Sequence, residues 1–213
     1  MNESGAVAFR AVDADGRAGV FLAEAAAVHA IATAGDQWSE FHGLPVVTAS
    51  GGVVFRATLV SGRDGIYVAH SGSIRVVAET GSVYSSLGFF PSVSEDEVVA
   101  FAATLHSGSS GIFRAEPDGT TATVLRDGAF ESYRGALIAD DRNLITLATP
   151  HGRTLGLFRG SHPVRDRLLG LNDSLLGSTV IELAANPVSI NRHGQAAVRV
   201  SLADGREAIL TTR

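Results

Sequence analysis

Histidine is the residue in this sequence with the widest range of possible chemistry. Imidazole can serve as general acid, general base or metal ligand near neutral pH. His106 and His151 occupy corresponding turns of two neighbouring repeats, and Asp64 and Arg153 fall in turns of the same kind, so we expect these four side chains to face one rim of the fold. No two histidines have the His-x-x-x-His spacing that brings a pair to one metal ion. The seven histidines are His29, His42, His70, His106, His151, His162 and His193.

Other motifs with catalytic or metal-binding potential are weaker. Asp13 and Asp15 precede Gly16 as at the start of a calcium loop, but no glutamate completes the twelve-residue pattern, and Asp-Gly turn chemistry explains them. Residues 108–111 place serines between glycines, yet no helical pattern follows, as a nucleophile elbow or phosphate loop requires. The acidic run at residues 95–97 is interpreted as a solvated turn. We predict no catalytic residue, no metal site and no cofactor.

Composition indicates a folded, turn-rich chain and excludes several classes of partner. The 213 residues include 24 glycines and no cysteine, 45% are hydrophobic and 18% are charged. A net charge of −5 offers no basic footprint for nucleic acid. The acidic N-terminus is not a signal peptide, and no apolar run approaches the ~18 residues of a membrane span. We expect a soluble chain without an export signal, in a compartment that the sequence leaves open.

A period of 46 residues runs through the chain. Phe9, Phe55 and Phe101 are 46 residues apart, and we place Leu147 and Val198 at the corresponding positions of two further units. A Gly-apolar-aromatic segment follows each of the first four, at residues 19–21, 65–67, 111–113 and 156–158. A regular period of this length is the signature of a repeat architecture.

Each unit contains four short segments with the alternation and β-branched enrichment of strands. Besides the two above, one ends at Gly35, Gly81 or Gly128, and a short one precedes each aromatic strand, at residues 45–47, 91–93, 136–138 and 187–189. The aromatic residues near 38, 84 and 130 are assigned to linking loops. Units of about 45 residues with four strands are typical of propeller blades. We predict one all-β domain over residues 1–213, a β-propeller of about five four-stranded blades with units of approximately 1–44, 45–90, 91–135, 136–186 and 187–213.

The first and last units are incomplete in this scheme, because the first lacks its innermost strand and the last its outermost. Ring closure would bring residues 1–9 and 198–213 into one sheet, and a site at the channel depends on that closure. An unsealed strand edge can pair with another chain. We therefore expect either a ring with a thin seam, a part of a longer chain, or a homodimer joined through the incomplete blades.

The chain resembles the bacterial NxxGxxAF tandem-repeat family. The resemblance rests on Asn2, Gly5 and Phe9 in "NESGAVAF" and on Asn191 and Gly194 in "NRHGQAAV", together with the strand text repeated between them. More loosely, the units are similar to TolB-like propeller repeats. The resemblance implies a propeller and, for the family, usually an exported protein; it implies no reaction.

Candidate ligand-binding residues lie in the loops that would surround one mouth of the channel. Aromatic side chains there can stack on sugars or peptides, although their periodicity favours packing, and the fourth unit adds a lengthened segment at residues 171–187 with arginines before it. We interpret the chain as a binding or scaffolding module for a carbohydrate or protein ligand. The alternatives are a propeller-type hydrolase, lactonase or lyase with its site at the central channel, or a structural repeat of a larger exported protein. The candidate residues are Trp38, His42, His106, His151, Arg153 and Arg165.

Overall fold

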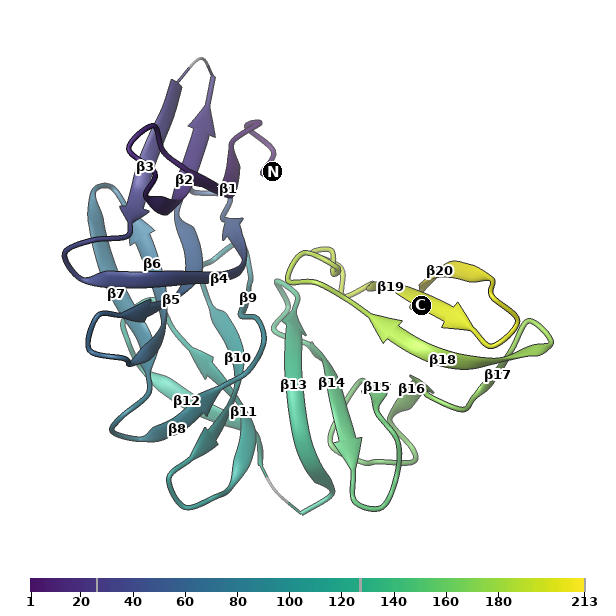
Figure 1. Cartoon of the computed structure of the whole chain (residues 1–213). Helices are drawn as coiled ribbons and strands as arrows, with labels where there is room; N and C mark the ends of the chain where they lie inside the picture. The colour runs from purple at the N-terminus through teal and green to yellow at the C-terminus, as the bar shows by residue number, and fades with distance from the viewer. Residues whose placement is uncertain (26, 127, 213) are drawn as a thin grey trace.

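The computed structural model describes residues 1–25, 27–126 and 128–212, and it contains strands and turns throughout this part of the chain. The strands form five small antiparallel sheets that follow one another along the chain (Figure 1), as the prediction of an all-β fold requires. Within the described ranges, no helix is long and apolar enough to cross a membrane.

The five sheets are numbered in chain order. The first contains β1 (Val7–Val12), β2 (Ala18–Glu24) and β3 (Ala27–Thr33). The second contains β4 (Trp38–Val47), β5 (Val53–Leu59), β6 (Asp64–His70) and β7 (Ser73–Glu79). The third contains β8 (Tyr84–Leu87), β9 (Ser92–Val93), β10 (Val99–Leu105), β11 (Ser110–Ala115) and β12 (Thr121–Arg126). The fourth contains β13 (Phe130–Ile138), β14 (Leu144–Pro150), β15 (Gly156–Phe158) and β16 (Arg167–Gly170). The fifth contains β17 (Ser174–Leu175), β18 (Ser178–Ala184), β19 (Ala197–Leu202) and β20 (Glu207–Thr211).

The first three sheets share one register, as the 46-residue period predicts. Phe9 pairs with Phe21, Phe55 with Tyr67, and Phe101 with Phe113 across the two central strands. The ring centroids of these pairs are 5.9, 5.5 and 5.7 Å apart. The second ring of each pair lies over the glycine two residues before it; a Cβ on Gly65 would fall 2.3 Å from the Tyr67 ring. Glycine therefore recurs there because the ring occupies the space of a side chain.

Register in the fourth sheet differs from the prediction by one residue. Thr146, not Leu147, pairs with Phe158, and Thr146 therefore stands where the first three sheets have phenylalanine. The cause is the preceding strand: β13 has nine residues where β4 has ten. Because side chains alternate along a strand, a slip of one residue exchanges the two faces. Leu147 consequently packs toward the fifth sheet.

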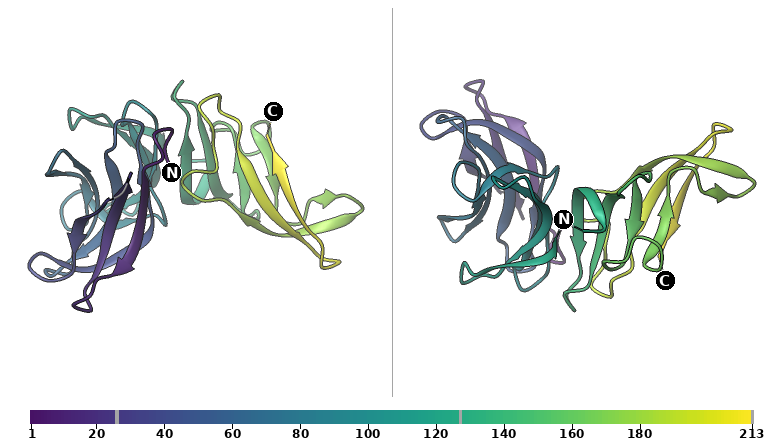
Figure 2. Two further views of the ribbon diagram at one scale, coloured as in Figure 1. Left: turned by 90° about the horizontal axis from the view of Figure 1, so that it is seen from above. Right: turned by 90° about the horizontal axis from the view of Figure 1, so that it is seen from below.

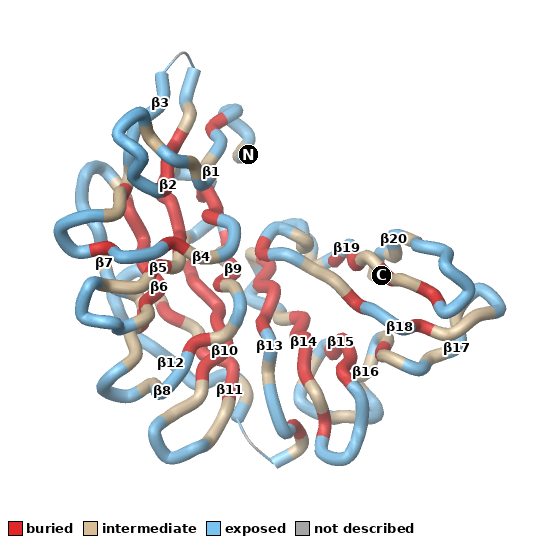
Figure 3. Tube along the Cα trace, in the orientation of Figure 1, coloured by how far each residue is buried: buried red, intermediate tan, exposed pale blue. Residues whose placement is uncertain are grey.

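The hydrophobic core is divided into layers between consecutive sheets. One cluster joins the first and second sheets, another the second and third, a third the third and fourth, and a fourth the fourth and fifth. A small additional cluster lies within the fourth sheet. Buried residues accordingly line the central strands of each sheet, while the loops are exposed (Figure 3). Each sheet is too thin to cover its own apolar faces, so its neighbours cover them.

The five sheets follow an open arc, and the first and last sheets lie apart in all three views (Figures 1 and 2). Strands β1 and β20 belong to different sheets. Among the residues that the structure describes, the two chain ends therefore do not pair into one sheet, the closure on which a channel site depended. Within residues 1–25, 27–126 and 128–212, the first sheet lacks an innermost strand, and in the fifth sheet β20 has no further strand on its outer side.

The innermost strands differ from the prediction at two points. The aromatic segments assigned to loops are strands: Trp38 begins β4, Tyr84 begins β8 and Phe130 begins β13. In the fifth unit, residues 187–189 form a turn, and the innermost strand is β18, which lies inside the segment interpreted as a lengthened linker. Sequence analysis missed this strand because β18 has no aromatic residue of the kind that begins β4, β8 and β13.

Candidate functional site

A four-residue turn leads into the second strand of every unit, and we call these five segments the inner turns. In each, the amide of the fourth residue donates a hydrogen bond of 2.9–3.1 Å to the carbonyl oxygen of the first. The fourth residue has positive φ in all five, a conformation that favours glycine. The Asn-x-x-Gly motif of the first and fifth units is therefore one sequence that forms a turn common to all five units. The inner turns are residues 2–5, 48–51, 94–97, 139–142 and 191–194.

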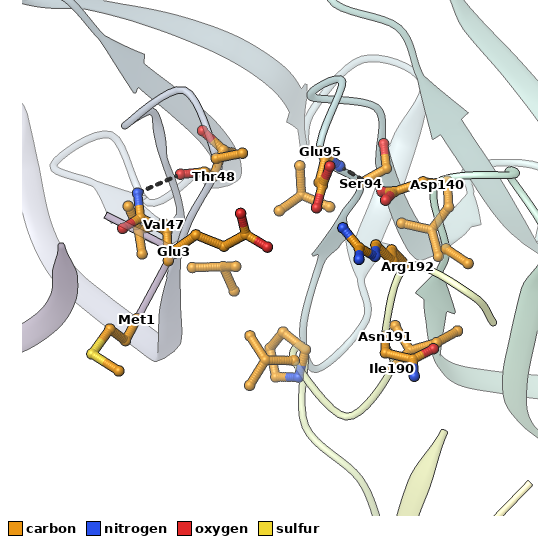
Figure 4. Close-up of a pocket in the computed structure, with 18 residues that line it drawn as sticks. Met1, Glu3, Val47, Thr48, Ser94, Glu95, Asp140, Ile190, Asn191 and Arg192 are labelled. Atoms are coloured by element: carbon orange, nitrogen blue, oxygen red, sulfur yellow. Dashed lines mark hydrogen bonds between the residues drawn. The ribbon is translucent and has the colours of Figure 1, made fainter. Parts of the chain in front are cut away.

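The inner turns of all five units line one cavity, which we call the hub cavity (Figure 4). Its volume is about 240 Å³. Apolar side chains from the ends of the innermost strands form part of its wall, among them Val47, Val93 and Ile138, and Val188 and Ile190 add to it from the fifth unit. A small, partly apolar recess with polar groups at its opening is the usual form of a binding site.

Charged side chains stand at the opening of the hub cavity. They occupy the second position of the inner turns, which holds Glu3, Ala49, Glu95, Asp140 and Arg192 in the five units. Four of these five residues thus carry a charge, three negative and one positive (Figure 4). Among the described residues, Arg192 makes no ion pair with the three carboxylates; its Nε lies 3.4 Å from His193 Nε2. The opening can therefore receive a ligand group that brings its own charge.

Hydrogen bonds between units hold the walls of the hub cavity in place. Asn2 Nδ2 donates to the Thr48 carbonyl oxygen at 2.9 Å, and the Glu95 amide donates to Asp140 Oδ1 at 2.8 Å. Ser92 is fully buried; its Oγ donates to the Pro187 carbonyl oxygen at 3.0 Å and accepts from the amide of Ile138. These bonds join the first unit to the second, and the third unit to the fourth and fifth, so the charged residues stand on hydrogen-bonded backbone.

A second polar cluster connects the second and third sheets. Glu97 Oε1 accepts hydrogen bonds from Ser50 Oγ and from Thr48 Oγ1, the latter at 3.4 Å, and lies 2.9 Å from His70 Nδ1. A serine nucleophile would require His70 to contact Ser50, whereas both contact the same carboxylate oxygen. The arrangement therefore joins two sheets. Residues 95–97 were expected to form a solvated turn, but the Glu97 side chain is only 17% exposed.

Trp38 and His42, two of the predicted ligand-binding residues, are occupied by contacts within the fold. The Trp38 ring is buried and lies 4.6 Å from the Tyr67 ring and 5.6 Å from the Phe55 ring. His42 Nε2 is 2.6 Å from Thr58 Oγ1. For the Trp38 ring, the structure supports packing rather than stacking on a ligand.

The other four predicted residues are exposed on turns and loops. His106 and His151 share the same backbone environment, since each amide donates to a carbonyl of the preceding segment, Val83 and Ala129 respectively. In the described chain no side-chain hydrogen bond joins these two histidines to each other or to Arg153. Arg165 forms an ion pair with Asp166 at 2.7 Å. The ligand binding of these four residues remains a prediction.

The hub residues were missed because their side chains are not periodic. Glu3, Glu95, Asp140 and Arg192 share a position, but the residue type changes from unit to unit, so a search for recurring types passes over them. Their shared position in the repeat could have identified them, because each directly follows the first residue of an inner turn. Glu97 and Arg142 carried a similar signal, since both stand where other units have glycine.

Comparison with known proteins finds similarity to solved structures but no match in sequence. No protein-family model matches the chain, and no curated protein matches its sequence. A solved structure of a catalytically inactive virginiamycin B lyase from Staphylococcus aureus with quinupristin is similar in fold, with 9% sequence identity and a TM-score of 0.44. The similarity covers 98% of this chain and 71% of that chain.

Proposed function

We propose that this chain is a non-enzymatic binding module of the propeller type, and that its ligand enters the hub cavity. One observation supports this proposal above the others. The strands that build the sheets repeat apolar residues, whereas the second position of the inner turns carries different charges in different units. Packing of the sheets does not explain why the charge at this position varies, whereas recognition of a particular ligand would explain it.

The charges favour a basic ligand group. Glu3, Glu95 and Asp140 outnumber Arg192 at the opening, and the whole chain has a net charge of −5. A volume of about 240 Å³ is below the ~300–1,000 Å³ of sites for drug-sized molecules. The cavity therefore suits one Lys side chain of a protein partner, with its methylene stem against Val47, Val93 and Ile138. This assigns a protein rather than a carbohydrate as partner, and the resemblance to the NxxGxxAF repeats fits a binding role without a reaction.

Binding of isolated lysine analogues tests the proposal. Nα-acetyl-lysine amide should shift backbone NMR signals of the inner turns, whereas Nα-acetyl-norleucine amide, which lacks the charge, should not. Each exposed ion pair contributes about 0.2–1 kcal/mol, so Glu95→Gln should weaken binding by a factor of roughly 1.4 to 5. The combined Glu3→Gln, Glu95→Gln and Asp140→Asn variant should abolish binding.

Glu40→Gln is the matched control, because Glu40 is exposed on β4 and does not line the hub cavity. It should leave the titration unchanged. Equal binding of the two analogues, or shifts outside the inner turns, would contradict the proposed site.

A further inference from the structure

Every internal sheet packs through two different faces. We call the face toward the preceding sheet the trailing face and the face toward the following sheet the leading face. In the second sheet, Phe55 and Tyr67 lie on the trailing face, in the cluster shared with the first sheet. Val54 and Ile66 lie on the leading face, in the cluster shared with the third. The trailing face is thus aromatic and the leading face is aliphatic.

The leading face of the fifth sheet repeats this pattern, but no sheet of the described chain packs against it. Counted from the inner turns, Ala197 corresponds to Val54 and Ile209 to Ile66. Ile66 is 1% exposed and Ile209 is 67% exposed. A large aliphatic side chain thus stands in solvent at a position that is buried in each of the other four sheets.

The polar part of the leading face is repeated as well. In the second sheet, Arg56 pairs with Asp64 at 2.9 Å, and its Nη1 donates to the Gly88 carbonyl oxygen of the third sheet at 2.7 Å. Arg10 of the first sheet likewise donates to the Phe41 carbonyl oxygen of the second. Arginine at this position therefore joins consecutive sheets in two of the four internal interfaces.

Arg199 occupies the same position in the fifth sheet and pairs with Glu207, the counterpart of Asp64, at 2.6 Å. It also pairs with Glu182 at 2.8 Å. Its side chain is 40% exposed, against 16% for Arg56. The group that elsewhere reaches the next sheet is preserved here on an open face.

The trailing face of the first sheet is the complementary half of the same interface. Phe9 and Phe21 stack at 5.9 Å with an interplanar angle of 25°, close to the 23° of Phe101 and Phe113. Val7 is 36% exposed, whereas its counterpart Val53 is fully buried. This aromatic face is formed without a sheet on its other side.

We propose that copies of this chain associate head to tail, with the leading face of the fifth sheet of one copy against the trailing face of the first sheet of the next. The arc keeps the two faces of a single copy apart (Figure 2). A second copy supplies the complement of each face, because both halves of the repeated interface are present on one chain. Such a contact is heterologous, so it builds either a closed ring or a filament.

Cysteine cross-linking tests the arrangement directly, since the chain has no cysteine of its own. Ile66 and Phe101, the counterparts of Ile209 and Phe9 at an internal interface, belong to one core cluster. A mixture of the Ile209→Cys and Phe9→Cys variants should therefore form disulfide-linked dimers under mild oxidation, and neither variant should do so alone. Cross-linking of a single variant with itself would instead indicate a symmetric contact and overturn the proposal.

Sedimentation equilibrium of the full chain provides a second measurement that does not depend on Phe9. Ile209→Lys should weaken self-association at least tenfold without lowering the melting temperature. Val60→Lys is the control, because Val60 is 62% exposed but lies in a turn away from both faces. A chain that stays monomeric at all concentrations, or equal effects of the two lysine variants, would overturn the proposal.

Discussion

The second and fifth sheets each carry an arginine, a hydroxyl residue and a carboxylate in corresponding places, but only the second sheet is covered on both faces. Arg56, Thr58 and Asp64 correspond to Arg199, Ser201 and Glu207. In the second sheet Arg56 also donates to the backbone of the next sheet. In the fifth sheet Arg199 and Ser201 bond to Glu207 and to Glu182, all within the same sheet. The contribution of a residue in this repeat is thus set by the sheet that covers it.

The aromatic position should show the largest difference between covered and open sheets. Phe55 is 1% exposed and contacts the rings of Trp38, Phe41 and Tyr67. Phe55→Ala should lower the free energy of unfolding by about 3–5 kcal/mol, because it leaves a cavity in a closed layer. Phe9→Ala should cost about 1–2 kcal/mol, since one side of that ring has no neighbouring sheet. Urea titrations of the two variants measure the difference, and equal losses would refute the comparison.

The arginine position should show the next largest difference. Arg56→Ala removes the bond to the Gly88 carbonyl and leaves Asp64 without its cation, so we expect a loss of about 2 kcal/mol. Arg199→Ala should cost less than about 0.5 kcal/mol, because exposed ion pairs contribute little. Measurement at low protein concentration keeps the proposed self-association out of the comparison. A loss for Arg199→Ala as large as that for Arg56→Ala would show that coverage is irrelevant.

The sequence predicts the architecture better than the site, for physical reasons. Apolar residues that recur in the sequence, such as Phe9, Phe55 and Phe101, indicate positions that pack between or against sheets, and the same packing arrangement recurs along the fold. β13 is one residue shorter than β4, which the sequence pattern did not reveal, and this difference moved Leu147 to the opposite face of the sheet. The hub cavity is formed by turns that come together in space, and the repeat period in the sequence does not show which turns do so.

Acid should weaken the covered interface through Asp64. Burial would raise the pKa of this carboxyl, but the hydrogen bonds from Thr58 and Arg56 outweigh it and hold the pKa below its usual value. A pKa that is lower in the folded chain contributes stability above the unfolded value of about 3.9, and that stability is lost as the pH falls through the folded value. The melting temperature should therefore fall below about pH 4, and less steeply in Asp64→Asn. The same slope in both proteins would exclude Asp64 as a source of the acid sensitivity.

The smallest expected effect is a gain in stability at Thr146. This residue is fully buried in the fourth sheet, and within the described chain its Oγ1 has no hydrogen-bond partner. Valine has nearly the same shape without the unpaired hydroxyl, so Thr146→Val should raise the free energy of unfolding by about 1 kcal/mol. Thr58→Val is the matched control, because the Thr58 hydroxyl donates to Asp64 Oδ1 at 2.6 Å and the same substitution should there lower stability by about 1 kcal/mol. Chemical denaturation of both variants measures the sign of each change. A loss of stability in Thr146→Val would contradict the prediction, because it would mean that the Thr146 hydroxyl has a hydrogen-bond partner in solution.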